Sequence, residues 1–295
     1  MKILNYGSLN IDETYAVPHF VQAGETLAPT AFARNTGGKG LNQSVALRRA
    51  GAEVYHAGCI GEDGSFLTDF LTAAGVDCRF VRRVDTPTGR AIIQVVPAGQ
   101  NCILLFGGAN QAQREADMRE TLAHFGAGDA LLLQNEINGI DFLVREAHAR
   151  GMRVVLNPSP FDESLLALPC DAIDLFILNE VEAAAMSGES APHAALRALR
   201  VRYPHADVLL TLGSQGSLYS GKEGDFAQKA YRVQAVDTKG AGDTFTGYFL
   251  ASVSAGMPVP QAMELAARAS AVAVTRPGAA AAVPTPAEIK TYDFS

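Results

Sequence analysis

Short apolar runs and segments with helical spacing alternate along most of this 295-residue chain. From about residue 113 onward, apolar runs at 130–133, 154–156, 175–178 and 208–212 predict strands, and helices are predicted at 139–150, 179–187 and 192–202. Earlier the chain has a predicted strand at 3–6, a helix at 41–50, a strand at 54–59 and a helix at 66–74, and two helices close it at 243–255 and 260–275. This alternation predicts an α/β fold with a mostly parallel central sheet and helices on both faces.

Two stretches depart from this alternation. Residues 88–96 and 101–106 are rich in β-branched and apolar residues and are joined by Pro97-Ala98-Gly99-Gln100, as in an antiparallel hairpin. Residues 13–37 read as short strands and turns, so 13–37 and 88–106 are expected to form a small separate sheet. Residues 218–220 and 226–236 predict antiparallel strands at the edge of the main sheet.

Composition narrows the function. A hydrophobic content of 48% supports a sizeable core, and a net charge of −7 argues against nucleic acid or an anionic membrane as the main partner. Four scattered cysteines without a C-x-x-C pair suggest neither a zinc site nor a disulfide framework. No apolar run reaches the length of a membrane span, and the start of the chain resembles a strand rather than a signal peptide. We therefore expect a single domain, 1–295, that works in the cytoplasm.

Polar side chains follow several predicted strands. They are Asn10 and Asp12 after the first strand, then Asn135 with Glu136, Asn157, Asn179, and Thr211 with Gly213. Because ligands bind at the carboxyl ends of parallel strands, these residues are candidates for a binding site. Any one of them could be a turn residue, but polar residues after five strands are harder to explain as turns.

The stretch Gly240-Ala241-Gly242-Asp243 precedes a long apolar helix. Small residues in front of a helix leave its N–H groups open to an anion such as a phosphoryl group. Asp243, expected at the N-cap, would then take the proton from an attacking hydroxyl. The alternative is a glycine-rich turn capped by Asp243. The chain contains no P-loop and no dinucleotide-binding fingerprint that would provide another phosphate site.

Several separated motifs together resemble the PfkB, or ribokinase-type, family of carbohydrate kinases. They are Gly7-Ser8-x-Asn10-x-Asp12, Gly37 to Gln43, Gly107 to Asn110, Asn179-x-x-Glu182, Thr211 to Gly216, and the stretch from Val233 through Asp243 to Ala279. The resemblance covers nearly the whole chain. It implies a ribokinase-like fold with a small β-sheet lid and the transfer of a phosphoryl group from ATP to a sugar hydroxyl.

The resemblance also implies roles for individual residues. The sugar would be held by Asn10, Asp12, Gly38, Lys39, Gly40, Asn42 and Glu136, with Asp243 as the base, Gly240 to Gly242 as the anion hole, and Lys39 near the transferred group. Asn179 and Glu182 would serve the phosphates and Mg²⁺, while Thr211, Gly213, Ser214, Gly216, Gly242 and Ala267 would line the nucleotide. Asp237, Lys239, Ala273, Arg276, Gly278 and Ala282 match positions that bind a monovalent cation, K⁺.

The resemblance therefore leads us to expect a kinase that converts D-ribose and ATP to D-ribose 5-phosphate and ADP. The alternatives are a kinase for another small sugar or a nucleoside, and a non-catalytic sugar-binding relative. Because a sheet as small as the lid is marginally stable alone, and the family commonly clasps two lids together, we also expect a homodimer.

Overall fold

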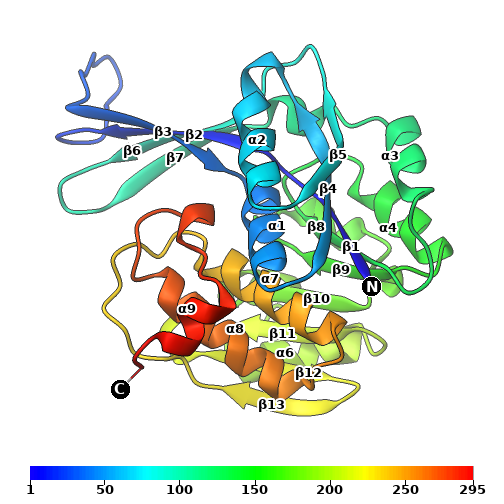
Figure 1. Ribbon diagram of the computed structural model, residues 1–295. Helices are drawn as coiled ribbons and strands as arrows, with labels where there is room; N and C mark the ends of the chain where they lie inside the picture. The colour runs from blue at the N-terminus through cyan, green and yellow to red at the C-terminus, as the bar shows by residue number, and fades with distance from the viewer. Residues whose placement is uncertain (295) are drawn as a thin grey trace.

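The computed structural model describes residues 1–294 and is built around a nine-stranded sheet (Figure 1). From one edge to the other, its strands are β13 (Gly224–Gln228), β12 (Ser217–Gly221), β11 (Asp207–Thr211), β10 (Leu175–Asn179), β9 (Arg153–Asn157), β8 (Ala130–Gln134), β1 (Lys2–Tyr6), β4 (Glu53–Ile60) and β5 (Asp77–Arg83). The strands from β11 to β5 pair in parallel, whereas β12 and β13 are antiparallel. The predicted α/β fold is confirmed.

Helices cover both faces of this sheet, because alternate residues of each buried strand point to opposite sides. One face packs against α1 (Lys39–Arg49), α2 (Ser65–Ala73), α7 (Ala241–Ser254) and α8 (Val259–Ala273), and the other against α3 (Glu115–Leu122), α4 (Ile140–Ala149), α5 (Glu180–Ser187) and α6 (Pro192–Arg202). In β8, for example, Leu132 joins the first core, and Leu131 and Leu133 join the second. A short helix, α9 (Pro286–Thr291), packs on α8.

The small sheet stands apart from the body and projects from it as a separate layer (Figure 1). Its strand order is β3 (Ala31–Gly37), β2 (Asn10–Ala16), β6 (Gly89–Val95) and β7 (Asn101–Phe106). The expected antiparallel hairpin of β6 and β7 is confirmed, and β2 pairs with β6 in parallel. We call this sheet the lid.

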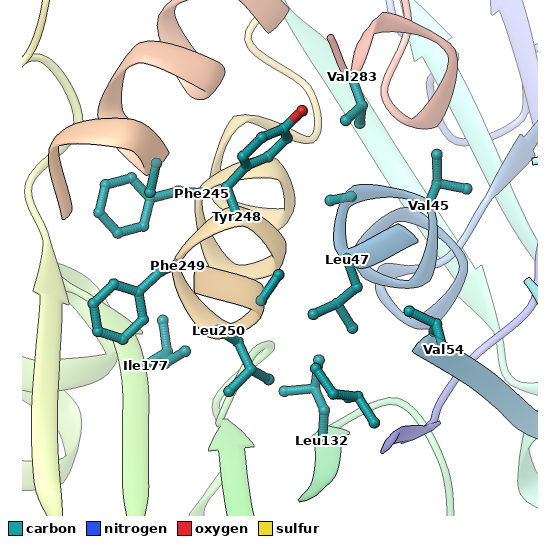
Figure 2. Packing of buried hydrophobic residues seen from close by; sticks show 14 of the residues in the cluster. Val45, Leu47, Val54, Leu132, Ile177, Phe245, Tyr248, Phe249, Leu250 and Val283 are labelled. Atoms are coloured by element: carbon teal, nitrogen blue, oxygen red, sulfur yellow. The ribbon is translucent and has the colours of Figure 1, made fainter. Parts of the chain in front are cut away.

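The two helices α1 and α7 lie side by side against the large sheet. Figure 2 shows Tyr248, Phe249 and Leu250 of α7 facing the same core as Leu47 of α1. The Tyr248 hydroxyl donates a hydrogen bond of 2.6 Å to the carbonyl oxygen of Pro284, so this buried aromatic residue has a partner for its polar end. The contact ties the middle of α7 to the segment that follows residue 282.

Some predicted elements differ from those observed. The strand expected over 226–236 ends at Gln228, because the N–H groups of Val236 and Asp237 donate to the carbonyl oxygen of Val274 instead of a neighbouring strand. The sequence pattern also missed β5, α3 and α9. Within the described residues, we find no helix with the length and apolar character needed to span a membrane.

Candidate active site

A pocket opens where the carboxyl ends of the central strands meet the first turn of α7. Of the residues predicted for the site, its wall brings together Lys39, Asn157, Asn179, Glu182, Thr211, Gly240, Ala241, Gly242 and Asp243. The wall does not include the other residues predicted for the sugar and the nucleotide, which are Asn10, Asp12, Gly38, Gly40, Asn42, Glu136, Gly213, Ser214, Gly216 and Ala267. The phosphoryl half of the predicted site is therefore one continuous cavity.

Unpaired backbone N–H groups face this pocket from the start of α7. Gly240 is the N-cap and has a left-handed backbone with φ of 69°, and a Cβ there would lie 2.8 Å from that of Ala279. The N–H groups of Gly240, Gly242 and Asp243 have no backbone partner within residues 1–294, whereas that of Ala241 donates to the Thr238 carbonyl at 3.3 Å. A Cβ on Gly242 would meet no atom within 4 Å, so glycine there leaves the space in front of these groups open. This helix terminus is suited to an anion.

Asp243 is the third residue of α7, so the expectation that it is the N-cap is wrong. Gly240 takes that place because its left-handed backbone starts the helix earlier. The Asp243 side chain is only 8% exposed. Two amides of α1 hold it: Asn42 Nδ2 donates to Oδ2 and Gln43 Nε2 donates to Oδ1, both at 2.9 Å. The carboxylate does not cap its own helix and instead faces α1.

Lys39, the first residue of α1, is partly buried, and its ammonium group forms no ion pair within residues 1–294. Burial alone would lower its pKa, but the carboxylates of Asp243, Glu136 and Glu182 outweigh burial and raise that pKa. Lys39 is therefore a persistent positive charge at the wall of the pocket without a direct partner.

Asn10 and Asp12 lie two apart on β2, so both side chains point to the same face of the lid. Asn110 orients Asn10: its Oδ1 accepts from the N–H of Leu9 at 3.0 Å, and its Nδ2 donates to Asn10 Oδ1 at 2.7 Å. Because a backbone N–H can only donate, this chain leaves Nδ2 of Asn10 as the free group. Burial and then the nearby Glu136 raise the pKa of Asp12 to about 6, partly offset by Lys239.

Glu136 and Ser8 complete the N-terminus of α1. Glu136 Oε2 accepts from the Lys39 N–H at 3.0 Å and from the Ser8 hydroxyl, and Ser8 Oγ accepts from the N–H of Gly40 at 3.2 Å. Gly38 is the N-cap of this helix. Burial raises the pKa of Glu136, and the charge of Lys39 only partly offsets it. The motif at 37–43 therefore packs against the turn after β1. This packing brings Glu136 beside Gly38, Lys39 and Gly40, which are predicted to bind the sugar.

Asn179 and Glu182 form a capping box at the start of α5. Asn179 Oδ1 accepts from the N–H groups of Val181 and Glu182, and Glu182 Oε2 accepts from the N–H of Asn179 at 2.9 Å. Glu182 is buried and lines the pocket, so it is not a surface residue of α5. Of the residues predicted to line the nucleotide, Gly213 and Ser214 form a short turn before Gly216, and Ala267 is buried on α8.

The predicted cation residues gather in two loops beside α7. Asp237 ties the loops together, since Oδ1 accepts from the N–H of Lys239 and Oδ2 from the N–H of Gly278, both at 3.0 Å. Arg276 turns away to an ion pair of 2.8 Å with Glu288. Of the other predicted cation residues, Ala273 and Ala282 are buried near these loops. We find no cluster of three or more His, Cys, Asp or Glu side chains with metal-binding geometry in residues 1–294.

Sequence reasoning did not assign four residues that the structure brings to the site. Gln43 contacts Asp243, Asn110 orients Asn10, Ser8 contacts Glu136, and Ser159 lines the pocket. Three of these lie within the motifs that carry the resemblance, and Ser159 follows shortly after β9. The signal was present, but a contact across about 200 residues of chain, such as Gln43 to Asp243, has no local pattern.

Free N–H groups at a helix terminus, an unpaired ammonium group and a held carboxylate are what phosphoryl transfer to a hydroxyl needs. The site therefore defines a phosphotransferase.

The chain belongs to the pfkB family of carbohydrate kinases, whose family model matches residues 1–286. It is 35% identical over 300 residues to the ribokinase of Haemophilus influenzae, covering 98% of this chain and 96% of the relative. It is also similar to the structure of ribokinase from Cryptococcus neoformans in complex with ADP, with a TM-score of 0.86, 32% identity and coverage of 98% of both chains. A third similar protein is the ribokinase of Arabidopsis thaliana complexed with ribose and ATP, with a TM-score of 0.85, 29% identity, and coverage of 98% of this chain and 97% of that one.

Replacing Asp243 with Asn tests whether Asp243 is the general base. The variant keeps the shape of the side chain but cannot take a proton, so we expect turnover to fall by roughly 10²–10⁴-fold, as for loss of a general base, with sugar affinity nearly unchanged. Steady-state kinetics and calorimetric sugar binding measure the two effects. Asp225→Asn, an exposed carboxylate on β13, is the matched control and should behave like the wild type. Turnover of Asp243→Asn within a few-fold of wild type would remove Asp243 from the base role.

Proposed function

We propose that this protein is a ribokinase that transfers the γ-phosphoryl group of ATP to the 5-hydroxyl of D-ribose. The observation that carries the proposal is the Asp243 carboxylate, held by two amides beside unpaired N–H groups and the unpaired ammonium group of Lys39. The ribokinases to which the chain is similar support ribose as the sugar. A kinase of this kind works where ATP is supplied, which favours the cytoplasm.

In this proposal the sugar lies between the lid and α1. Asp12 and Glu136 accept hydrogen bonds from sugar hydroxyls, and the free Nδ2 of Asn10 donates one. The small residues Gly38 and Gly40 allow the sugar to approach the start of α1, where Asn42 contacts it. Since the pKa of Asp12 is raised to about 6, its carboxylate is ionised at neutral pH and becomes protonated as the pH falls below that value.

The phosphoryl group lies in front of the free N–H groups of Gly240, Gly242 and Asp243, with Lys39 beside it. Asp243 takes the proton of the attacking hydroxyl while the sugar oxygen bonds to the γ-phosphorus and the bond to ADP breaks. The nucleotide lies along Thr211 to Gly216 and towards Ala267. Glu182, a carboxylate at the pocket that Asn179 holds in place, fits the acidic group expected near Mg²⁺, which neutralises phosphate charge when bound.

A panel of sugars tests the proposed substrate. Asn10 Nδ2 loses its partner when a sugar lacks the hydroxyl it contacts, so ribose should be preferred over 2-deoxyribose by about 1–3 kcal/mol in transition-state binding. Asn10→Met removes this donor and offers an apolar surface, so the preference should narrow or reverse. The measurement is kcat/KM for each sugar with ATP, in the wild type and the variant.

Two outcomes of this panel would contradict the proposal. A wild-type kcat/KM for 2-deoxyribose equal to or above that for ribose would reject ribose as the preferred sugar. A hexose or a nucleoside as the best substrate would favour a kinase for another small sugar or a nucleoside. No turnover of any sugar would favour a non-catalytic sugar-binding relative. An intact Asp243 with both of its amide donors argues against that last alternative.

We also propose that a monovalent cation activates the enzyme. Asp237 offers a carboxylate, and the carbonyl oxygens of Lys239 and Gly278 accept no backbone hydrogen bond within the described chain. A cation there would stiffen the two loops that end at the anion hole. Rates should therefore rise in potassium chloride and much less in sodium chloride, compared with tetramethylammonium chloride at the same ionic strength. Equal rates in all three salts would contradict K⁺ activation.

Finally, we propose a homodimer that forms through the lid. The edge strand β7 exposes four consecutive apolar residues, with Ile103 48%, Leu104 68%, Leu105 58% and Phe106 51% exposed. An edge strand of this kind invites pairing with another chain, and a second lid is the cover of matching chemistry.

Light scattering at micromolar concentration should give twice the mass of one chain. Leu104→Lys places a charge in the proposed interface and should produce monomers. The control is Val201→Lys, which changes an apolar residue on α6 that is 82% exposed and should leave the dimer intact. A wild-type monomer with full activity would argue against lid pairing.

A further inference from the structure

Behind Asp243 lies a chain of buried side-chain amides that reaches the far side of α1. Gln43 is fully buried and makes three side-chain hydrogen bonds: Nε2 donates to Asp243 Oδ1 and to Asn157 Oδ1, both at 2.9 Å, and Oε1 accepts from Gln134 Nε2 at 2.7 Å. Gln134 Nε2 also donates to Asn5 Oδ1 at 2.9 Å.

Two backbone carbonyls fix the direction of this chain. Asn157 Nδ2 donates to the carbonyl oxygen of Ile177 at 2.7 Å, so Asn157 must turn its oxygen to Gln43. At the other end, Asn5 Nδ2 donates to the carbonyl oxygen of Gly40 at 2.7 Å, so Asn5 turns its oxygen to Gln134. A carbonyl oxygen can only accept, and both ends therefore require the same orientation of Gln43, with its NH₂ group towards Asp243.

We propose that Gln43 is a positioning residue that dictates which oxygen of Asp243 takes the proton from the sugar. This inference rests on the proposed function of Asp243 as the base. Oδ1 always faces an N–H of Gln43 and cannot hold a proton there. The sugar O–H bond therefore breaks with its proton moving to Oδ2, while the sugar oxygen bonds to the γ-phosphorus and the bond between that phosphorus and the leaving ADP oxygen breaks.

Asn42, which faces Oδ2, is oriented differently. Its Nδ2 donates to Oδ2 at 2.9 Å, but its own Oδ1 is buried and has no hydrogen-bond partner in the described chain. No backbone group fixes this amide, so it can turn over and accept from Oδ2 once that oxygen carries a proton. One oxygen of Asp243 thus faces a fixed donor and the other faces an amide that can serve as donor or acceptor.

The test is the isosteric variant Gln43→Glu, which keeps the shape but replaces the donor with an acceptor. A second acid beside Oδ1 favours the protonated form of Asp243, so the acid limb of the kcat–pH profile should move to higher pH by at least one unit. Other charged groups around Asp243 are Lys39 on α1 and Glu136 after β8, and this variant leaves both in place. At neutral pH, kcat should fall about 10- to 100-fold, with KM for sugar and ATP within a few-fold of wild type.

Gln43→Met removes the donor without adding an acid and should lower kcat with a smaller shift of the limb. Gln113→Met is the control, because Gln113 is also a buried glutamine but contacts Cys59 outside the pocket. It should lower the melting temperature without moving the pH profile.

The kcat of the Gln43 variants relative to wild-type kcat tests this inference. The turnover of the wild-type enzyme itself tests the proposed function. A folded Gln43→Glu enzyme with the wild-type kcat and pH limb would overturn the assignment. If neither Gln43 variant folds while Gln113→Met does, the assignment is also overturned, since Gln43 would then be a structural residue.

Discussion

The close contact between α1 and α7 is the constraint on which the site depends. Gly247 of α7 lies so near α1 that a Cβ there would be 2.3 Å from the Cβ of Ala46. Because the helices touch at this depth, the amides of Asn42 and Gln43 reach across to Asp243 at 2.9 Å. Buried apolar residues of α7 around this contact hold the arrangement in place. Burying each of the larger side chains stabilises the fold by about 1.5–3 kcal/mol. The fold thereby fixes a carboxylate beside an anion-binding helix terminus.

The charges of the pocket explain why a phosphorylated ligand and a cation belong together here. Three carboxylates surround Lys39, and their attraction outweighs the burial that would otherwise lower its pKa. A unit charge pair at about 4 Å is worth roughly 4 kcal/mol near a protein surface. Lys39 carries a single positive charge, which cannot neutralise three carboxylates and a triphosphate. Backbone N–H groups at α7 and a divalent cation supply the remaining positive charge, which is consistent with a Mg²⁺–nucleotide substrate.

The sequence predicted much of the fold because its patterns are local. Buried parallel strands read as apolar runs, and polar residues after them, such as Asn179, lie at the edge where ligands bind. The contacts behind the site were not predictable in this way, since Gln43 meets Asp243 only after α1 and α7 pack. In the segment 229–236, a local pattern predicted a strand that does not form. The N–H groups at the end of this segment donate to the carbonyl oxygen of Val274, at the end of α8, and not to a neighbouring strand. Asp243 was misplaced at the N-cap because the left-handed backbone of Gly240 is a property of the loop packing against Ala279.

A crystal structure with D-ribose and a non-hydrolysable ATP analogue would show whether Asp243 and the start of α7 hold the reacting groups. One sugar hydroxyl should lie within hydrogen-bonding reach of Asp243 Oδ2, roughly 2.6–3.2 Å, with Oδ1 still bound to Gln43. The terminal phosphate should lie on the N–H groups of Gly240, Gly242 and Asp243, in line with that hydroxyl. A sugar whose hydroxyls all lie beyond the reach of Asp243, or a terminal phosphate away from the start of α7, would contradict it.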